Sequence, residues 1–105
     1  MDMLKYHKFG IGNCWSEDFG NADKEEEFPF LKEFSPLHNV KSGVKYPSVL
    51  LATADHDDRV APLHSMKLIA EMQHTIGVQE NPILIRIEKN AGHGAGMPTS
   101  KIIAE

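Results

Sequence analysis

The clearest pattern of hydrophobic and polar positions lies in the second half of the chain. Residues 48–54, SVLLATA, form a nearly continuous apolar run of strand-forming residues, which is typical of a strand buried on both faces of a parallel sheet. Residues 63–76 repeat apolar side chains every three or four positions, and this spacing predicts an amphipathic helix between Pro62 and Gly77. Residues 83–88, ILIRIE, alternate between two faces, which favours a strand nearer the edge of the sheet.

The remaining segments carry weaker patterns. Residues 22–34 start with acidic side chains and continue into phenylalanines, which favours a short helix with carboxylates near its positive end. Residues 1–21 hold glycines and aromatic residues without a regular period, so we expect an ordered loop there. Turn formers in residues 35–47 indicate an irregular connection. A glycine-rich loop is expected from Asn90 to Gly96, and a last helix from Pro98.

The order strand, helix, strand and helix predicts an α/β fold. A right-handed crossover makes the two strands parallel, so the loops that follow them lie at the same carboxyl edge of the sheet. Catalytic groups gather at that edge in open α/β sheets. We therefore expect Asp57 and His93 to converge, although 36 positions separate them.

The predicted sheet is too small for a complete domain. Two or three strands do not cover both faces of a buried parallel sheet. Ordering all 105 residues costs on the order of 150 kcal/mol, at roughly 1.5 kcal/mol per residue. We therefore expect residues 1–105 to be one partial domain, taken from a larger fold with a mostly parallel sheet.

Composition narrows the class of protein. The 105 residues carry 11 Lys and Arg against 15 Asp and Glu, a net charge of −4, with 41% hydrophobic and 25% charged residues, which is globular composition. Without a basic cluster, neither nucleic acid nor an anionic membrane surface is an expected partner. No apolar run approaches the roughly 20 residues that span a bilayer, and no signal sequence is evident. With Cys14 as its only cysteine, the protein is expected to be soluble and cytoplasmic.

His93 is the first candidate for chemistry, because the flanking glycines in Gly92-His93-Gly94 leave its ring room to turn into a cleft. Asp57 would accept a hydrogen bond from one ring nitrogen and stabilise the imidazolium that forms when His93 acts as a general base. Aspartate followed by histidine, each after a strand, is the order of the last two triad members in α/β-hydrolases. No serine before Asp57 has the Gly-x-Ser-x-Gly frame of the nucleophile. The structural alternative is a loop histidine among turn glycines.

Other interpretations follow from neighbouring residues. The acidic loop at residues 55–58 could hold a metal ion, but it lacks an EF-hand spacing and the two-histidine pattern of zinc proteases, so no metal is expected. Arg59 would either bind a substrate carbonyl or pair with a nearby aspartate, and pairing is the more common role. Trp15 and Phe19 would either line an apolar pocket or pack as ordinary core aromatics.

Four segments, DMLKYHKFGIGNCW, SPLHNVK, LLATADHDDRVAPLHS and AGHGAGMPT, closely resemble the carboxyl-terminal catalytic region of the prolyl oligopeptidase family. The similarity extends over nearly all 105 residues. It implies a partial α/β-hydrolase fold, the C-terminal β-α-β-α portion of that domain. It also implies a cytosolic serine peptidase that needs no cofactor, cleaves short peptides after proline and carries a β-propeller that restricts entry.

The same resemblance implies a role for each matching residue. Asp57 and His93 correspond to the triad aspartate and histidine. Arg59 resembles the arginine that binds a substrate backbone carbonyl. Three positions match the pocket for the substrate proline: Trp15, Phe19 and Val60. Phe19 stands where a tyrosine is usual in the family.

By that resemblance, the serine turn, the oxyanion donors and the propeller would lie before Met1, and the last helix would continue beyond Glu105. We therefore expect a fragment of a post-proline endopeptidase that is inactive by itself. Its expected partners are short proline-containing peptides, the remainder of the catalytic domain and the propeller. The alternatives are a non-catalytic module that binds proline-containing peptides and an unstable truncated product.

Overall fold

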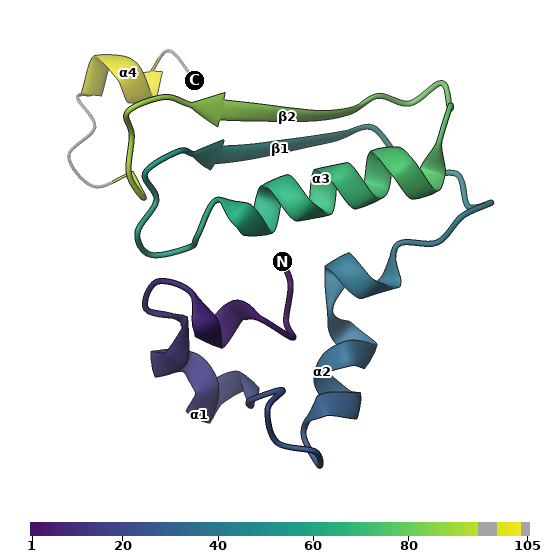
Figure 1. The fold of residues 1–105 in the computed structure, drawn as a ribbon. Helices are drawn as coiled ribbons and strands as arrows, with labels where there is room; N and C mark the ends of the chain where they lie inside the picture. Colours follow the sequence, from purple (N-terminus) through teal and green to yellow (C-terminus); the bar gives the residue numbers. More distant parts are fainter. Residues whose placement is uncertain (95–98, 104–105) are drawn as a thin grey trace.

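The computed structural model describes residues 1–94 and 99–103, and its centre is a parallel pair of strands joined by one long helix (Figure 1). Strand β1 spans Val49–Ala54 and strand β2 spans Ile83–Glu88. Their register runs from the Val49 and Ile83 pair to the Ala54 and Glu88 pair. The expected parallel pairing is confirmed, so both strands deliver their following loops to one edge of the sheet.

Helix α3, Leu63–Ile76, connects the two strands and packs against both. It begins directly after Pro62, whose fixed φ and missing amide proton suit the start of a helix. It ends at Gly77, which has a φ of +68°, a conformation that glycine adopts without a steric cost. Neither α3 nor any other helix in the described ranges is long and apolar enough to cross a membrane.

The sheet has one covered face and one open face within the described chain. Successive side chains on a strand point to opposite faces, and in β1 Val49 and Leu51 are half-buried whereas Leu50 is 65% exposed. On β2, the register partner of Leu50 is Leu84, which is 54% exposed. Within the described chain α3 thus covers only one face of β1, and burial of its other face stays a prediction for the larger fold.

The amino-terminal part consists of short helical turns that lie below α3 in Figure 1. They replace the loop that was expected for residues 1–21. The helix expected over residues 22–34 is shorter, because Pro29 fits only the first turn of a helix. In chain order the elements are η1 Tyr6–Lys8, η2 Gly12–Trp15, α1 Ser16–Phe19, α2 Phe28–Phe34 and η3 Pro36–Asn39.

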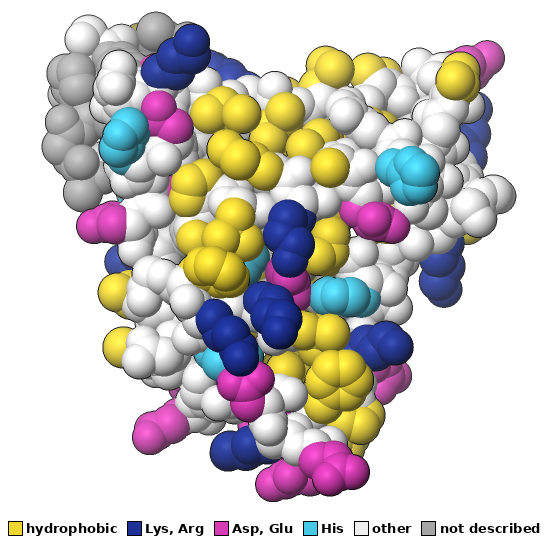
Figure 2. All heavy atoms as spheres, in the orientation of Figure 1, with side chains coloured by type: hydrophobic (Ala, Val, Ile, Leu, Met, Phe, Trp, Pro, Cys, Tyr) yellow, Lys and Arg dark blue, Asp and Glu magenta, His cyan; other side chains and the backbone are white. Residues whose placement is uncertain are grey.

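A small core holds these turns together. Met3, Tyr6 and Leu31 are buried against one another, and the Tyr6 hydroxyl donates to the carbonyl oxygens of Trp15, at 3.3 Å, and Gly20. Figure 2 shows hydrophobic side chains gathered over the strands and α3, and charged side chains of both signs over the part below α3. The chain thus has two packed regions that meet along α3.

A buried polar cluster joins the amino terminus to α3. The Asp2 side chain is 2% exposed; its carboxylate pairs with Lys67 and accepts the Leu4 amide at 3.0 Å. The Asp2 amide donates to Nδ1 of His64 at 3.3 Å. Since Nδ1 accepts this hydrogen bond, the proton of the neutral His64 ring is on Nε2.

The His64 contact predicts a pH dependence of stability. Burial lowers the pKa of His64 below its ordinary value of about 6.5. Because the unfolded chain then binds the proton more tightly, the stability from His64 is complete above pH 6.5 and is lost as pH falls below it, by at most about 1.4 kcal/mol per pH unit. Measured by urea unfolding, the free energy of unfolding should fall more between pH 7 and pH 5 in the wild type than in His64→Gln. An equal fall in the free energy of unfolding in the wild type and in His64→Gln would contradict this assignment. His74→Gln is the control, because His74 is exposed.

Candidate active site

Asp57 and His93 lie in contact at the carboxyl edge of the sheet. Nδ1 of His93 is 2.7 Å from Oδ2 of Asp57, so the expected convergence of the two loops is confirmed. His93 is at the tip of a tight turn, in which the amide of Gly94 donates to the carbonyl oxygen of Gly92 at 2.8 Å. Gly94 has a φ of +83°, which explains why the turn needs glycine there.

The Asp57 carboxylate is held by backbone amides on its other oxygen. Oδ1 accepts the amides of Arg59, at 3.0 Å, and Val60, at 2.8 Å. Burial raises the pKa of Asp57, but the hydrogen bonds from the Val60 amide, from His93 and from the Arg59 amide outweigh it, so the pKa lies below its usual range. Asp57 is therefore an anion at neutral pH, with one oxygen fixed and the other directed at His93.

This charge state settles the tautomer of a neutral His93. An ionised carboxylate only accepts hydrogen bonds, so the proton lies on Nδ1 and the lone pair on Nε2. The Asp57 side chain is 11% exposed and the His93 side chain 43% exposed. The pair can therefore take a proton at Nε2 from an incoming group and stabilise the resulting imidazolium.

A hollow of about 420 Å³ adjoins the pair at the carboxyl ends of the strands. Its walls come from both strands and from the loops that follow them: Leu50, Ala52, Thr53, Ala54, Asp57, Arg86, Glu88, Ala91, Gly92, His93 and Gly94. The other predicted residues of the glycine-rich loop, 95 and 96, and Pro98 lie outside the described residues. Helix α4, Thr99–Ile103, follows them.

Arg59 and Val60 are brought to the same loop as Asp57. Arg59 is exposed, and of the ion pairs formed within the described chain one joins Asp55 to His56 and none includes Arg59. The expectation that pairing is its main role is therefore wrong here, since the loop turns its side chain to solvent while its amide binds Asp57. Val60 is half-buried. Sequence reasoning missed the two amide donors, although an aspartate that bonds amides two and three positions ahead is a common turn pattern.

Trp15 and Phe19 contact the amino-terminal core. Trp15 packs against the buried cluster around Tyr6, and the Phe19 ring meets the Tyr6 ring edge to face at 6.3 Å between centroids. Ordinary packing thus accounts for these contacts. This region adjoins the Asp57 loop, because a Cβ added to Gly10 would lie 2.8 Å from the carbonyl oxygen of Asp58.

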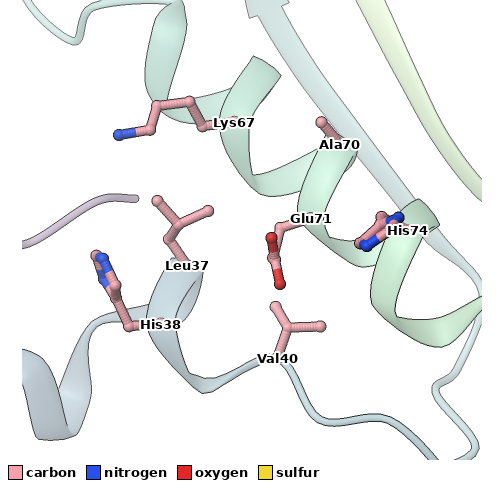
Figure 3. Close-up of a pocket in the computed structure, with 7 residues that line it drawn as sticks. All are labelled: Leu37, His38, Val40, Lys67, Ala70, Glu71 and His74. Atoms are coloured by element: carbon pink, nitrogen blue, oxygen red, sulfur yellow. The ribbon is translucent and has the colours of Figure 1, made fainter.

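A second hollow, of about 650 Å³, lies between η3 and α3 (Figure 3). Its charged groups already have partners, since Lys67 pairs with Asp2 and Glu71 accepts the Thr75 hydroxyl at 2.6 Å. No group of three or more His, Cys, Asp and Glu side chains comes together to hold a metal ion among the residues that the structure describes. The Asp57 and His93 pair is therefore the strongest candidate site for chemistry.

Parallel strands that carry an aspartate and then a histidine at their carboxyl ends are typical of the α/β-hydrolase class. Comparison with known proteins agrees with this class. The profile of the prolyl oligopeptidase family matches residues 1–105, and the chain belongs to that family. The resemblance seen in the sequence is confirmed.

Named relatives support the assignment. Prolyl oligopeptidase A of Galerina marginata is 52% identical over 104 residues, covering 99% of this chain and 14% of the relative. Prolyl endopeptidase of Elizabethkingia meningoseptica is 54% identical over 106 residues, covering 100% of this chain and 15% of the relative. The chain thus spans about one seventh of the length of these relatives.

Solved structures give the same result. A structure from a study of two prolyl endopeptidases has a TM-score of 0.91 and 44% identity over 99% of this chain and 15% of its own. Prolyl oligopeptidase B of Galerina marginata, solved as a serine-to-alanine variant with a 35-residue substrate, has a TM-score of 0.91 and 42% identity over 97% of this chain and 14% of its own. The fold is therefore a part of an α/β-hydrolase catalytic domain.

Proposed function

We propose that residues 1–105 supply the aspartate and the histidine of a serine peptidase that cleaves short peptides on the carboxyl side of proline. The observation that carries this proposal is the 2.7 Å contact between His93 and an Asp57 carboxylate whose second oxygen is held by two amides. Membership of the prolyl oligopeptidase family supports the same reaction class. The nucleophilic serine belongs to another part of a longer polypeptide.

In this mechanism, Nε2 of His93 takes the proton from the serine hydroxyl as the serine attacks the carbonyl carbon of the peptide bond. The imidazolium that forms is stabilised by the Asp57 anion at Nδ1. His93 then gives the proton at Nε2 to the leaving amine, and the acyl-enzyme is hydrolysed by a water molecule that His93 activates in the same way. Asp57 stays ionised throughout, because its pKa is held low.

Recognition of proline is assigned to four residues by their match to the family. Trp15 stacks on the proline ring, Phe19 and Val60 form further walls, and Arg59 binds a substrate carbonyl. The exposed Arg59 side chain beside Asp57 supports its part of this role. A purely non-catalytic module for proline-containing peptides would use the same side chains but would need neither Asp57 nor His93, so the contact between these two residues favours the peptidase.

The open face of the sheet is proposed to contact the remainder of the catalytic domain, which in the longer polypeptide also carries a β-propeller. Leu50 and Leu84 are neighbours across the two strands and are 65% and 54% exposed. Burying one exposed leucine side chain stabilises the folded protein by about 1.5–3 kcal/mol. A covering layer from the rest of the chain would therefore both bury this strip and bring the serine to His93.

Two chromogenic peptides that differ only in proline or alanine before the cleaved bond test the function. The complete polypeptide that carries residues 1–105 should cleave the proline peptide with a kcat/KM about 10- to 200-fold higher, the discrimination that an apolar pocket gives. The 105-residue chain alone should give no turnover. Equal cleavage of both peptides, or turnover by the short chain that disappears in His93→Ala, would overturn the proposal.

A further inference from the structure

Asp55 connects the loop that carries Asp57 to the loop that carries His93. Its carboxylate oxygen Oδ1 accepts the Ala91 amide at 3.3 Å. Ala91 lies two residues before His93. The side chain of Asp55 thus reaches from the end of β1 to the turn that leads to the histidine.

Backbone bonds beside Asp55 close the same junction. The Asp55 amide donates to the carbonyl oxygen of Glu88 at 3.0 Å, and the His56 amide donates to that of Ala91 at 3.0 Å. The first bond extends the strand pairing by one step beyond Ala54 and Glu88, and the second joins the two loops beyond the regular register. The Asp55 carboxylate therefore binds the turn where the regular pairing ends.

The turn that Asp55 binds has an unusual backbone. Asn90 has a φ of +54° and is the one residue other than glycine with a positive φ in the described ranges. Asparagine tolerates this left-handed conformation better than most residues. The following residue, Ala91, is buried, so its amide needs a partner inside the protein. The Asp55 carboxylate supplies that partner.

We propose that Asp55 is a positioning residue for the peptidase: it fixes the Asn90–Ala91 turn and thereby holds His93 at hydrogen-bonding distance from Asp57. This role rests on the proposed function, but the contact itself does not. Asp55 does not touch the reacting atoms and acts only through the loop.

The charge state of Asp55 suits this role. A hydrogen bond from the adjacent His56 side chain, at 2.6 Å, is the main reason why the pKa of Asp55 falls to about 2, and the amides of Asn90 and Ala91 lower it further. The carboxylate is therefore ionised over the whole range in which a histidine titrates. The His56 side chain is 70% exposed, which leaves the loop amides as the inward-facing partners.

Three variants of the complete polypeptide test the proposal. Asp55→Ala removes the acceptor, Asp55→Asn keeps an acceptor oxygen in nearly the same shape, and Asp58→Asn changes an exposed carboxylate on the same loop. We expect Asp55→Ala to lower kcat about 10- to 100-fold, as loss of a supporting residue does, with KM within about twofold. Asp55→Asn should recover most of the activity, and Asp58→Asn should match the wild type.

Hydrogen exchange supplies a measurement that does not depend on activity. The amides of Asn90 and Ala91 should exchange at least about tenfold faster in Asp55→Ala than in the wild type, and at the wild-type rate in Asp58→Asn. Unchanged exchange in Asp55→Ala, or a loss of kcat in Asp55→Asn as large as in Asp55→Ala, would refute the positioning role. A wild-type protein without peptidase activity would instead refute the proposed function, while the exchange result still decides whether Asp55 holds the turn.

Discussion

Replacing Asp57 with asparagine is expected to lower the kcat of the complete peptidase about 10⁴-fold, the loss that follows when the catalytic histidine is left in the wrong tautomer. In the present structure Oδ1 of Asp57 is occupied by the amides of Arg59 and Val60. An asparagine would therefore keep its oxygen at these two donors and direct its NH₂ group at His93. Nδ1 of His93 would then have to accept, which moves the proton to Nε2 and removes the base.

Steady-state kinetics with the proline peptide measure this loss. Asp58→Asn is the matched control, because Asp58 is the next residue, carries the same charge and is exposed. KM should change little in Asp57→Asn, since the carboxylate is directed at His93 and not at the substrate. Activity of Asp57→Asn within tenfold of the wild type would show that the pair is not part of the catalytic machinery.

The second large effect is on stability. Leu31→Ala should lower the free energy of unfolding by about 3 kcal/mol, within the range of 2–5 kcal/mol seen for buried leucines. Leu31 is 1% exposed and packs with Met3 and Tyr6. Removing its side chain leaves a cavity at the centre of the amino-terminal core, which has few other apolar groups to fill it.

Urea unfolding of the purified chain provides the test, with Phe30→Ala as control. Phe30 is the neighbour of Leu31 on α2 but is 67% exposed, so its loss should change the free energy of unfolding by at most about 0.5 kcal/mol. If the two variants lost the same stability, Leu31 could not be the centre of a packed core.

The sequence predicted the elements whose pattern is long and bounded. Helix α3 and strand β2 have the expected limits, and β1 begins one residue later than expected. Helix α3 and strand β2 have a clear apolar period and β1 is a nearly continuous apolar run, while Pro62 and Gly77 mark the two ends of α3. Parallel pairing followed from the handedness of the crossover, and with it the contact between Asp57 and His93.

The amino-terminal turns could not be predicted in the same way. Three or four residues are too few to show a helical period, and η1 and η2 are fixed by contacts between residues six or more positions apart. At Gly12, an added Cβ would lie 2.0 Å from the carbonyl oxygen of Tyr6. The buried Ser35 likewise accepts the Met3 amide at 3.0 Å. Neither contact can be recognised from the residue types at neighbouring positions.

The details of the site escaped prediction for a related reason. The hydrogen bonds from backbone amides to Asp57 and to Asp55 depend on backbone conformation, which residue types specify only loosely. Arg59 was expected to pair with an aspartate, but the structure turns its amide inward and its side chain outward. The contact between Asp57 and His93 could be predicted from the sequence, whereas the backbone amides that hold the two loops could not.

The hydrogen bonds between the loop after β1 and the loop after β2 also indicate where the polypeptide chain can be opened. The connection from α3 to β2 lies at the opposite end of the strands from the loops that follow them (Figure 1), and Val78 within it is fully exposed. An unbroken chain at that point does not contribute directly to the contact between Asp57 and His93. New termini opened there, by circular permutation or by expressing two complementary fragments, should leave the contact between Asp57 and His93 intact, because the pairing of the strands brings the two loops together.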